Sequence, residues 1–196
     1  AMSYLSQALI PYASALDAKL TDGYAWHAAI WQSFPGRPDD ARDFLFRTDR
    51  RADGFRVLLL SEHQPAPTAA FVWQTKEVSP SFLEHAAYRF QLKANPTMRR
   101  SADGRRLAIF DETKLRAWLT RKAESAGFAV DADSLEVGAS MDETFVRDGQ
   151  RGKHVAVDFA GVLHVTDRTR FIQCFNTGIG SAKGFGYGLL TLQPIH

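Results

Sequence analysis

The segment Tyr88-Arg89-Phe90-Gln91-Leu92-Lys93-Ala94 decides how the second half of the chain is interpreted. Apolar and polar residues alternate strictly along it, which is typical of a β-strand with one buried face. Asn95-Pro96 follows directly and ends the strand, because proline has no N–H to donate to a neighbouring strand. We therefore place a half-buried strand here and work outward from it.

A helix is predicted downstream, over Asp111–Ala126. Leu115, Trp118 and Leu119 are spaced as neighbours on one helical face, and Gly127 is a typical stop signal. Next come two strands, Glu143–Arg147 and His154–Val165, which flank the turn Asp148–Lys153. A helix at Arg168–Asn176, a glycine-rich loop and a final strand at Leu189–Leu192 complete this half. The second half is therefore predicted as β-α-β-β-α-β.

The first half has a similar pattern. Tyr4–Ile10 is a predicted strand that Pro11 ends, and Tyr24–Gln32 is a predicted helix with Asp22 as its N-cap. Further strands are expected at Phe44–Thr48, Phe55–Leu60 and Phe71–Lys76, the first two joined by a turn with an Asp-Gly pair. This half is predicted as β-α-β-β-β.

Two successive patterns of this kind predict an α+β protein with two tandem ferredoxin-like (RRM-like) domains. The expected domains are residues 1–83, with the helix that carries Tyr24 and His27, and residues 84–196, with basic loops and the glycine-rich loop. RNA-recognition modules share this topology, so RNA is a candidate ligand on fold analogy alone.

The composition is that of an ordinary globular protein. The chain has 196 residues, 45% of them hydrophobic and 23% charged, which excludes collagen, a coiled coil and wholesale disorder. Cys174 is the only cysteine, so no intrachain disulfide is possible and a reducing cytoplasm fits. There is no apolar run of the ~20 residues that cross a bilayer and no secretion signal. We expect a cytoplasmic protein without a membrane partner.

Positive charge is concentrated although the net charge is only +2. Residues 88–122 hold ten basic and three acidic side chains, and four of these arginines stand in the short segment Met98–Arg106. Guanidinium groups bind phosphates in a bidentate way, so such a loop suits an RNA backbone. Arg147, Arg151 and Lys153 flank the other predicted turn. The same charges would also suit two solvated loop tips, and the counts do not separate these interpretations.

The glycine-rich stretch Gly178–Gly188 holds five of the 14 glycines, but it matches no nucleotide-binding motif. It precedes a strand, whereas a dinucleotide-binding loop follows one, and the P-loop pattern is absent. Dense glycine still allows backbone N–H groups to approach a phosphate, with Lys183 adding charge. The alternative is a flexible connection between a helix and a strand, and these residues alone favour it. The six histidines form no close ligand pair and the single cysteine excludes a Cys-based zinc site, so we expect no metal of this kind, while spacing leaves acidic Mg²⁺ sites open. No cofactor is expected.

Tyr24 and His27 are the candidates for chemistry. They are three residues apart on the predicted helix and therefore neighbours on its surface. At ~100° per residue, Trp26, Ile30 and Phe34 form the core stripe and His27 lies at its margin. An imidazole titrates near neutrality and a phenol donates a hydrogen bond, so the pair suits acid–base chemistry. A packing or surface role for His27 is the alternative.

Four motifs in chain order carry a resemblance to a known family. Gly36–Phe46 resembles the "RPDxARDFLF" stretch of the CasE family of CRISPR-associated endoribonucleases, the repeat-RNA processing subunits of the type I-E Cascade complex. Tyr24-Ala25-Trp26-His27 is similar to that family's Tyr-x-x-His. Tyr88–Pro96 is similar to its "RLxANP" strand, and Gly178–Leu190 to its "GIGxAKxxGxGLL" loop and strand.

The resemblance implies two ferredoxin-like domains and metal-independent cleavage of CRISPR precursor RNA within its hairpin repeat, with retention of the mature crRNA. It implies that His27 and Tyr24 are catalytic. The implied RNA-binding residues lie in the basic and glycine-rich segments: Lys93, Arg99, Arg100, Arg105, Arg106, Arg147, Arg151, Lys153, Gly180, Lys183 and Gly184. The implied partners are the repeat hairpin RNA or crRNA and other Cascade subunits.

The expected reaction uses the RNA's own 2′-hydroxyl as the nucleophile, which gives a 2′,3′-cyclic phosphate and a 5′-hydroxyl. His27 would act as base or acid, Tyr24 would position the 2′-hydroxyl or assist proton transfer, and Lys183 would stabilise the phosphorane. The assignment of acid and base between His27 and Tyr24 stays open. The alternatives are a non-catalytic RNA-binding module and a purely structural subunit of a complex.

Overall fold

The computed structural model describes residues 3–37 and 44–196. Contacts within the chain divide it into two compact units. The first consists of Ala1–Val78, Thr144–Gly152 and Gly184–Gly186, and the second of Ser79–Glu143, Lys153–Lys183 and Tyr187–His196. Two short segments of the second half therefore belong with the first half. The division into domains 1–83 and 84–196 stays a prediction.

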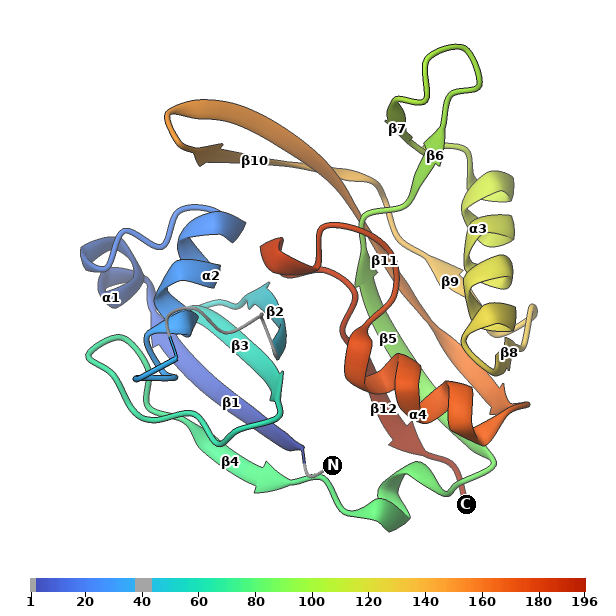
Figure 1. Cartoon of the computed structure of the whole chain (residues 1–196), viewed down its shortest axis with the longest axis horizontal. Helices are drawn as coiled ribbons and strands as arrows, with labels where there is room; N and C mark the ends of the chain where they lie inside the picture. The colour runs from blue at the N-terminus through green and yellow to red at the C-terminus, as the bar shows by residue number, and fades with distance from the viewer. Residues whose placement is uncertain (1–2, 38–43) are drawn as a thin grey trace. The chain divides into compact units, whose positions relative to one another are not determined.

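The first half of the chain forms a mixed α and β unit (Figure 1). Its elements in chain order are β1 (Tyr4–Pro11), α1 (Tyr12–Asp17), α2 (Gly23–Trp31), β2 (Phe44–Arg50), β3 (Gly54–Ser61) and β4 (Gln74–Glu77). The strands pair in an antiparallel sheet of order β2-β3-β1-β4.

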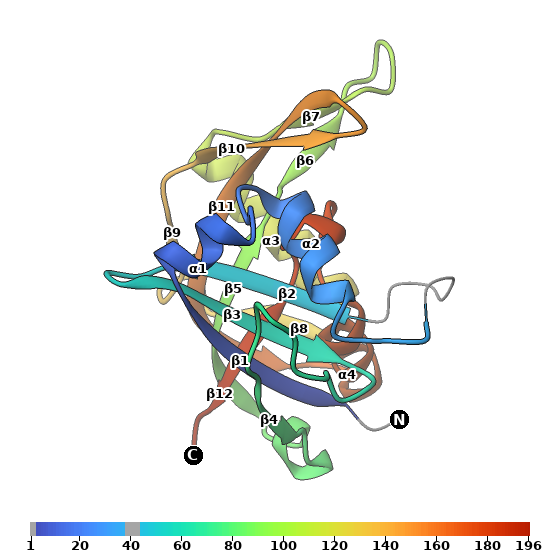
Figure 2. The ribbon, with the colours of Figure 1, turned by 90° about the vertical axis from the view of Figure 1, so that its left-hand side faces the viewer.

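One face of this sheet carries the core of the first unit. Figure 2 shows α1 and α2 on that face. Alternate residues of β1, Ala8 and Ile10, are buried there beside Phe46 of β2, while Trp26 and Ile30 come from α2. Burying such side chains stabilises the sheet by roughly 1.5–3 kcal/mol for each large one.

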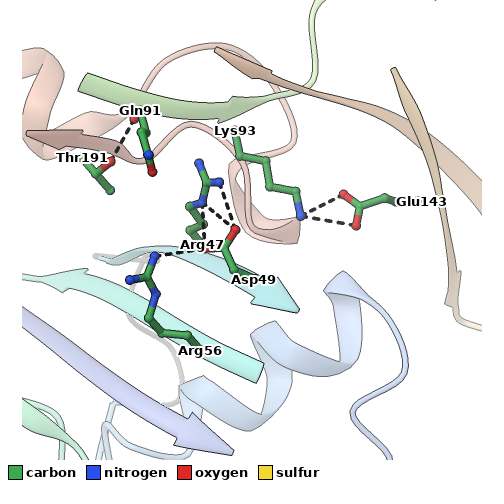
Figure 3. Close-up of polar contacts among 7 residues, drawn as sticks. All are labelled: Arg47, Asp49, Arg56, Gln91, Lys93, Glu143 and Thr191. Carbon is green, nitrogen blue, oxygen red and sulfur yellow. Dashed lines mark hydrogen bonds and ion pairs between the residues drawn. The ribbon is translucent and has the colours of Figure 1, made fainter. Parts of the chain in front are cut away.

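The opposite face of the sheet carries an ion-pair cluster (Figure 3). The Nε of Arg47 donates to Asp49 at 2.9 Å, and Arg56, the cross-strand neighbour of Asp49, lies 3.6 Å from the same carboxylate. Arg47 is only 7% exposed. A charged residue this deeply buried needs a partner, which Asp49 supplies.

The second half of the chain forms a larger sheet. Its elements in chain order are the 3₁₀ turn η1 (Pro80–Leu83), β5 (Ala87–Ala94), β6 (Thr97–Arg99), β7 (Arg106–Ala108), α3 (Glu112–Ser125), β8 (Phe128–Val130), β9 (Glu136–Val137), β10 (Met141–Arg147), β11 (Gln150–Val165), α4 (Arg168–Thr177), the 3₁₀ turn η2 (Lys183–Phe185) and β12 (Leu190–Pro194). The main strand order is β10-β11-β5-β12, with β8 and β9 also paired to β11.

Helices α3 and α4 cover one face of this sheet (Figure 1). The alternation predicted for β5 is confirmed, because Tyr88, Phe90, Leu92 and Ala94 are all buried. Trp118 of α3 stacks on Phe159 of β11 at 5.8 Å, and Tyr88 stacks on Phe171 of α4 at 5.4 Å between ring centroids. The buried Tyr88 hydroxyl donates to the Phe82 carbonyl.

When only the four strands of each main path are numbered, both sheets have the order 2-3-1-4, and β8 and β9 are additional strands paired to β11. That order, with a helix after the first strand, is the split βαβ arrangement of ferredoxin-like domains. The predicted fold class, two tandem ferredoxin-like domains, is therefore confirmed. In residues 3–37 and 44–196, no helix is long and apolar enough to cross a membrane.

Several predicted elements need correction. The strand predicted at Phe71–Lys76 begins only at Gln74, since Phe71 is a fully buried loop residue of the first core. The arginine-rich segment predicted as a loop forms the β6–β7 hairpin. β8, β9 and the position of α1 were not predicted, because each of these elements is at most six residues long and carries too short a periodic pattern.

Candidate active site

Helix α2 positions the two candidate catalytic side chains in the first unit. Asp22 is its N-cap, as predicted, and its Oδ1 accepts a hydrogen bond from the Ala25 N–H at 2.8 Å. Trp26 and Ile30 turn into the core, which leaves Tyr24 and His27 half-buried at the margin of the helix. The predicted placement of His27 at the edge of the core stripe is confirmed.

Aromatic rings hold the His27 imidazole. Its centroid lies 5.3 Å from the Phe44 ring at an interplanar angle of 29°, which is a stacked arrangement. Trp31, one turn further along α2, lies at 6.0 Å. These rings restrict the rotation of the imidazole, while the residue keeps part of its surface accessible. The Nε2 atom of the ring is itself buried, so the exposed part of the residue is not this nitrogen. A restrained imidazole is suited to proton transfer.

Tyr24 lies beside a cation. The guanidinium carbon of Arg147, at the end of β10, is 5.9 Å from the centroid of the Tyr24 ring. This distance is within the range of a cation–π contact. Phe185 approaches the same ring at 6.3 Å and in turn packs against Phe145 at 4.5 Å. Three segments far apart in the sequence therefore meet at the start of α2, all within the first unit.

Two glycines make this approach possible. A Cβ at residue 23 would lie 2.5 Å from the carbonyl oxygen of Phe185, a distance that no side chain allows. Gly186 has a positive φ of 98°, and a Cβ there would meet the Phe46 ring at 3.0 Å. The glycine-rich stretch thus has a packing role here that its composition alone did not reveal.

The turn that follows Arg147 is tighter than predicted. The sequence predicted a six-residue turn over Asp148–Lys153, but only Asp148 and Gly149 separate β10 from β11, both with positive φ. Arg151 and Lys153 therefore belong to β11. Lys153 pairs with Asp142 at 3.3 Å, and Arg147, whose side chain is 61% exposed, lies 3.7 Å from the Asp148 carboxylate.

The four clustered arginines lie on the β6–β7 hairpin of the second unit, which projects from its sheet (Figure 1). Arg99 and Arg106 are direct cross-strand partners. Arg100 forms an ion pair with Asp103, and its N–H donates to the Arg105 carbonyl at 2.8 Å. Like charges placed opposite each other destabilise a hairpin. The Arg99–Arg106 pair therefore does not stabilise the hairpin by itself and is better explained by binding of an anionic ligand.

Lys93 takes part in a polar cluster of the second unit. Its Nζ lies 3.1 Å from the Glu143 carboxylate (Figure 3), and the Tyr187 hydroxyl donates to the same group at 2.8 Å. Burial and Glu143 raise the pKa of Tyr187, and burial lowers the pKa of His154, whose ring is 5.6 Å from that of Tyr187. A contact between Lys93 and RNA stays a prediction.

Lys183 lines a cavity of about 300 Å³ in the second unit together with Lys122 and Arg170. Three cations around one hollow can receive a phosphate. Gly180 packs against the Trp118 ring, where a Cβ would be 3.1 Å from a ring carbon. Cys174 also lines this cavity, and burial raises the pKa of its thiol to about 11.

The predicted site residues fall into two groups. The first unit holds Tyr24, His27, Arg147, Arg151 and Gly184, and the second holds Lys93, Arg99, Arg100, Arg105, Arg106, Lys153, Gly180 and Lys183. Within the first group the structure brings Arg147 onto Tyr24. Phe185, which lies beside Tyr24, and Phe145, which packs on Phe185, were missed, because only the folded chain brings these rings together.

Comparison with known proteins identifies the family. A family model described as CRISPR associated protein matches residues 3–194. The CRISPR system Cascade subunit CasE of Escherichia coli strain K12 is 35% identical, and the match covers 98% of this chain and all of that protein. The chain belongs to the CasE family of CRISPR-associated proteins.

Other CasE-family proteins agree in sequence and in structure. The CRISPR-associated endoribonuclease Cse3 of Thermus thermophilus is 33% identical over 95% of this chain and 97% of its own. The solved structure of that organism's Cse3, bound to an RNA that represents a pre-cleavage complex, has a TM-score of 0.85 and 25% identity, and covers 99% of this chain and 100% of its own.

The motifs that carried the CasE resemblance now have structural places. Tyr24 and His27 are on α2, Tyr88–Pro96 forms β5 with the residues that end it, and Gly178–Leu190 leads into β12. Gly36–Phe46 lies partly outside the described residues, which resume at Phe44.

Proposed function

We propose that this protein is an endoribonuclease that cleaves CRISPR precursor RNA within the hairpin repeat and retains the product as a Cascade subunit. The observation that carries the proposal is the presence of a restrained imidazole and a phenol on one face of α2, with the Arg147 guanidinium over the phenol ring. Relatives named endoribonuclease and Cascade subunit support it.

The reaction needs no nucleophile from the protein. The ribose 2′-oxygen attacks the adjacent phosphorus, an O2′–P bond forms and the P–O5′ bond breaks. The proton of the 2′-hydroxyl passes to a base, and an acid gives a proton to the departing O5′. The products are a 2′,3′-cyclic phosphate and a 5′-hydroxyl, and the proton balance closes without a metal ion.

His27 and Tyr24 share the proton transfers in this proposal. A positioned acid or base accelerates such a step by roughly 10²–10⁴-fold. Arg147 would stabilise the extra negative charge of the phosphorane, and the position of its guanidinium over Tyr24 supports this role. Lys183, the cation that the sequence offered for this role, would bind a backbone phosphate from the cavity that it lines.

RNA recognition would depend on backbone shape. The arginines of the β6–β7 hairpin and Arg151 and Lys153 of β11 would contact phosphates of the repeat stem, which gives affinity that falls with salt. Other Cascade subunits are the expected protein partners. We expect the protein to act in the cytoplasm.

The test uses a repeat hairpin RNA from the host's own CRISPR array. We expect cleavage in the presence of EDTA, a cyclic phosphate on the upstream product and no cleavage when the nucleophilic 2′-hydroxyl is replaced by hydrogen. Cleavage of the deoxy substrate, or loss of cleavage in EDTA, would contradict the mechanism. Tight binding of the repeat without any cleavage would identify a non-catalytic RNA-binding module instead.

A further inference from the structure

One carboxylate joins two distant parts of the first unit. Oδ1 of Asp22 accepts the Ala25 N–H at 2.8 Å, which is the ordinary bond of a helix N-cap. Oδ2 of the same side chain accepts the Val146 N–H at 3.0 Å, from a residue 124 positions further along the chain. A serine or asparagine would cap the helix equally well, but only a carboxylate offers two equivalent acceptor oxygens.

Each bond holds one of the groups that the proposed reaction uses. The bond to Ala25 fixes the first turn of α2, on which Tyr24 stands and from which His27 follows one turn later. The bond to Val146 fixes the end of β10 one residue before Arg147. The two segments held in this way are in contact, since the Arg147 guanidinium lies 5.9 Å from the centroid of the Tyr24 ring.

Asp22 binds the side of β10 that has no strand neighbour. β10 is at the edge of its sheet, and Val146 and Arg147 are exposed. An edge strand has strand neighbours for only one side of its backbone, so the Asp22 carboxylate supplies an acceptor on the other side. Phe145 packs on Phe185 and shares a face of β10 with Arg147, so this contact and the Asp22 bond act on the same segment.

We propose that Asp22 is a positioning residue that holds Arg147 over Tyr24 and thereby sets the rate of RNA cleavage without contacting the RNA. This inference rests on the proposed endoribonuclease function. It predicts that the Asp22 carboxylate matters for the cleavage step and not for the affinity of the protein for the repeat.

The test separates the two bonds. Asp22→Ser keeps a side-chain oxygen at the N-cap but is too short to reach Val146. Val146→Pro removes the N–H that donates a hydrogen bond to Asp22, and proline is tolerated at such an edge position. Val146→Ala keeps this N–H and is the matched control. Each variant is assayed for single-turnover cleavage at saturating repeat RNA and for binding of the uncleavable 2′-deoxy repeat.

We expect Asp22→Ser and Val146→Pro each to lower the cleavage rate at least 10-fold, with less than a threefold change in the dissociation constant and a melting temperature close to that of the parent. Val146→Ala should cleave at the parental rate. The double variant should be no slower than either single one, because both remove the same bond. Amide hydrogen exchange should show lost protection at Val146 in Asp22→Ser, with Ala25 still protected.

Parental cleavage rates in both Asp22→Ser and Val146→Pro would overturn the inference, as would additive effects in the double variant or an equal loss of binding and cleavage. The proposed function fails separately: if the parent protein binds the repeat and does not cleave it, the endoribonuclease assignment falls and the positioning role falls with it. If the parent cleaves and the variants match it, only the role of Asp22 is wrong.

Discussion

Tyr24 offers an aromatic ring and a hydroxyl, and the two have different roles in this account. The ring lies beneath Arg147 and beside Phe185, so it helps to build the site. The hydroxyl is the part that can donate or relay a proton. A substitution that removes only the hydroxyl therefore separates chemistry from packing.

We expect Tyr24→Phe to lower the single-turnover cleavage rate by roughly 100-fold, the lower limit of the range for acid–base groups, with the affinity for the repeat unchanged. The matched control is Tyr12→Phe, which removes a hydroxyl that donates to the Arg51 carbonyl in the same unit. Equal rates in Tyr24→Phe and the parent would limit Tyr24 to a packing role.

For single residues, the sequence predicted those features that depend on residues nearby in the chain. The 100° periodicity of α2 placed His27 at the margin of the core, and Asp22 was assigned correctly as an N-cap. The second bond of Asp22, to Val146, was not predicted. No local pattern encodes a contact across 124 residues, because such a contact exists only when both sheets have formed.

At the scale of elements, none of the residues in β6 and β7 is fully buried. Met98 and Leu107 are cross-strand partners and are 44% and 41% exposed, so the hairpin has no buried face. Arg99 and Arg106 repel each other on the neighbouring pair. These features lower the stability of the free hairpin, and a bound polyanion would offset this loss.

We expect Arg99→Ala/Arg106→Ala to weaken RNA binding at least 10-fold at moderate salt and to reduce the slope of log K against log salt by about 1–2, since up to two phosphate contacts are lost. The melting temperature should stay the same or rise. Lys19→Ala/Arg51→Ala removes the same charge from the first unit and is the control. An unchanged affinity would make the hairpin a solvated tip.

The strands of this hairpin could not be predicted from the sequence. β1 and β5 were found because each buries one face, and burial imposes the alternation of polar and apolar residues. β6 and β7 bury little, so their sequence carries no such alternation and was interpreted as a loop. The two-residue turn before β11 was also overestimated in length, since Arg151 and Lys153 are polar strand residues on an exposed stretch.

At the scale of the whole molecule, folding stability should depend on His154. Burial lowers the pKa of His154 in the folded protein below its ordinary 6.5, and Glu143 offsets part of this effect. As the pH falls below that ordinary value, the unfolded chain takes up a proton that the folded chain does not. The free energy of unfolding therefore declines until the folded pKa is passed.

We expect urea unfolding midpoints of the parent to fall between pH 7.5 and pH 5, and His154→Gln to reduce this decline. The comparison is between the two proteins at each pH, because carboxylates titrate in both. An identical decline in parent and variant would show that His154 is not perturbed by folding. Cleavage activity plays no part in this measurement.

The whole-molecule architecture followed from the order of its elements. Two β-α-β-β patterns in succession predicted tandem ferredoxin-like domains, and both sheets have the expected strand order. The assignment of Thr144–Gly152 and Gly184–Gly186 to the first unit was not predicted, because it depends on contacts that local sequence does not specify.

The most direct test of the account concerns the imidazole on α2. His27→Ala and His164→Ala, the latter an exposed strand histidine of the second unit, are compared in single-turnover cleavage of the repeat RNA and in binding of its 2′-deoxy form. We expect His27→Ala to lose roughly 10²–10⁴-fold in cleavage rate and to bind the RNA normally, while His164→Ala, the control, cleaves at the parental rate. Cleavage by His27→Ala at the parental rate would contradict the account.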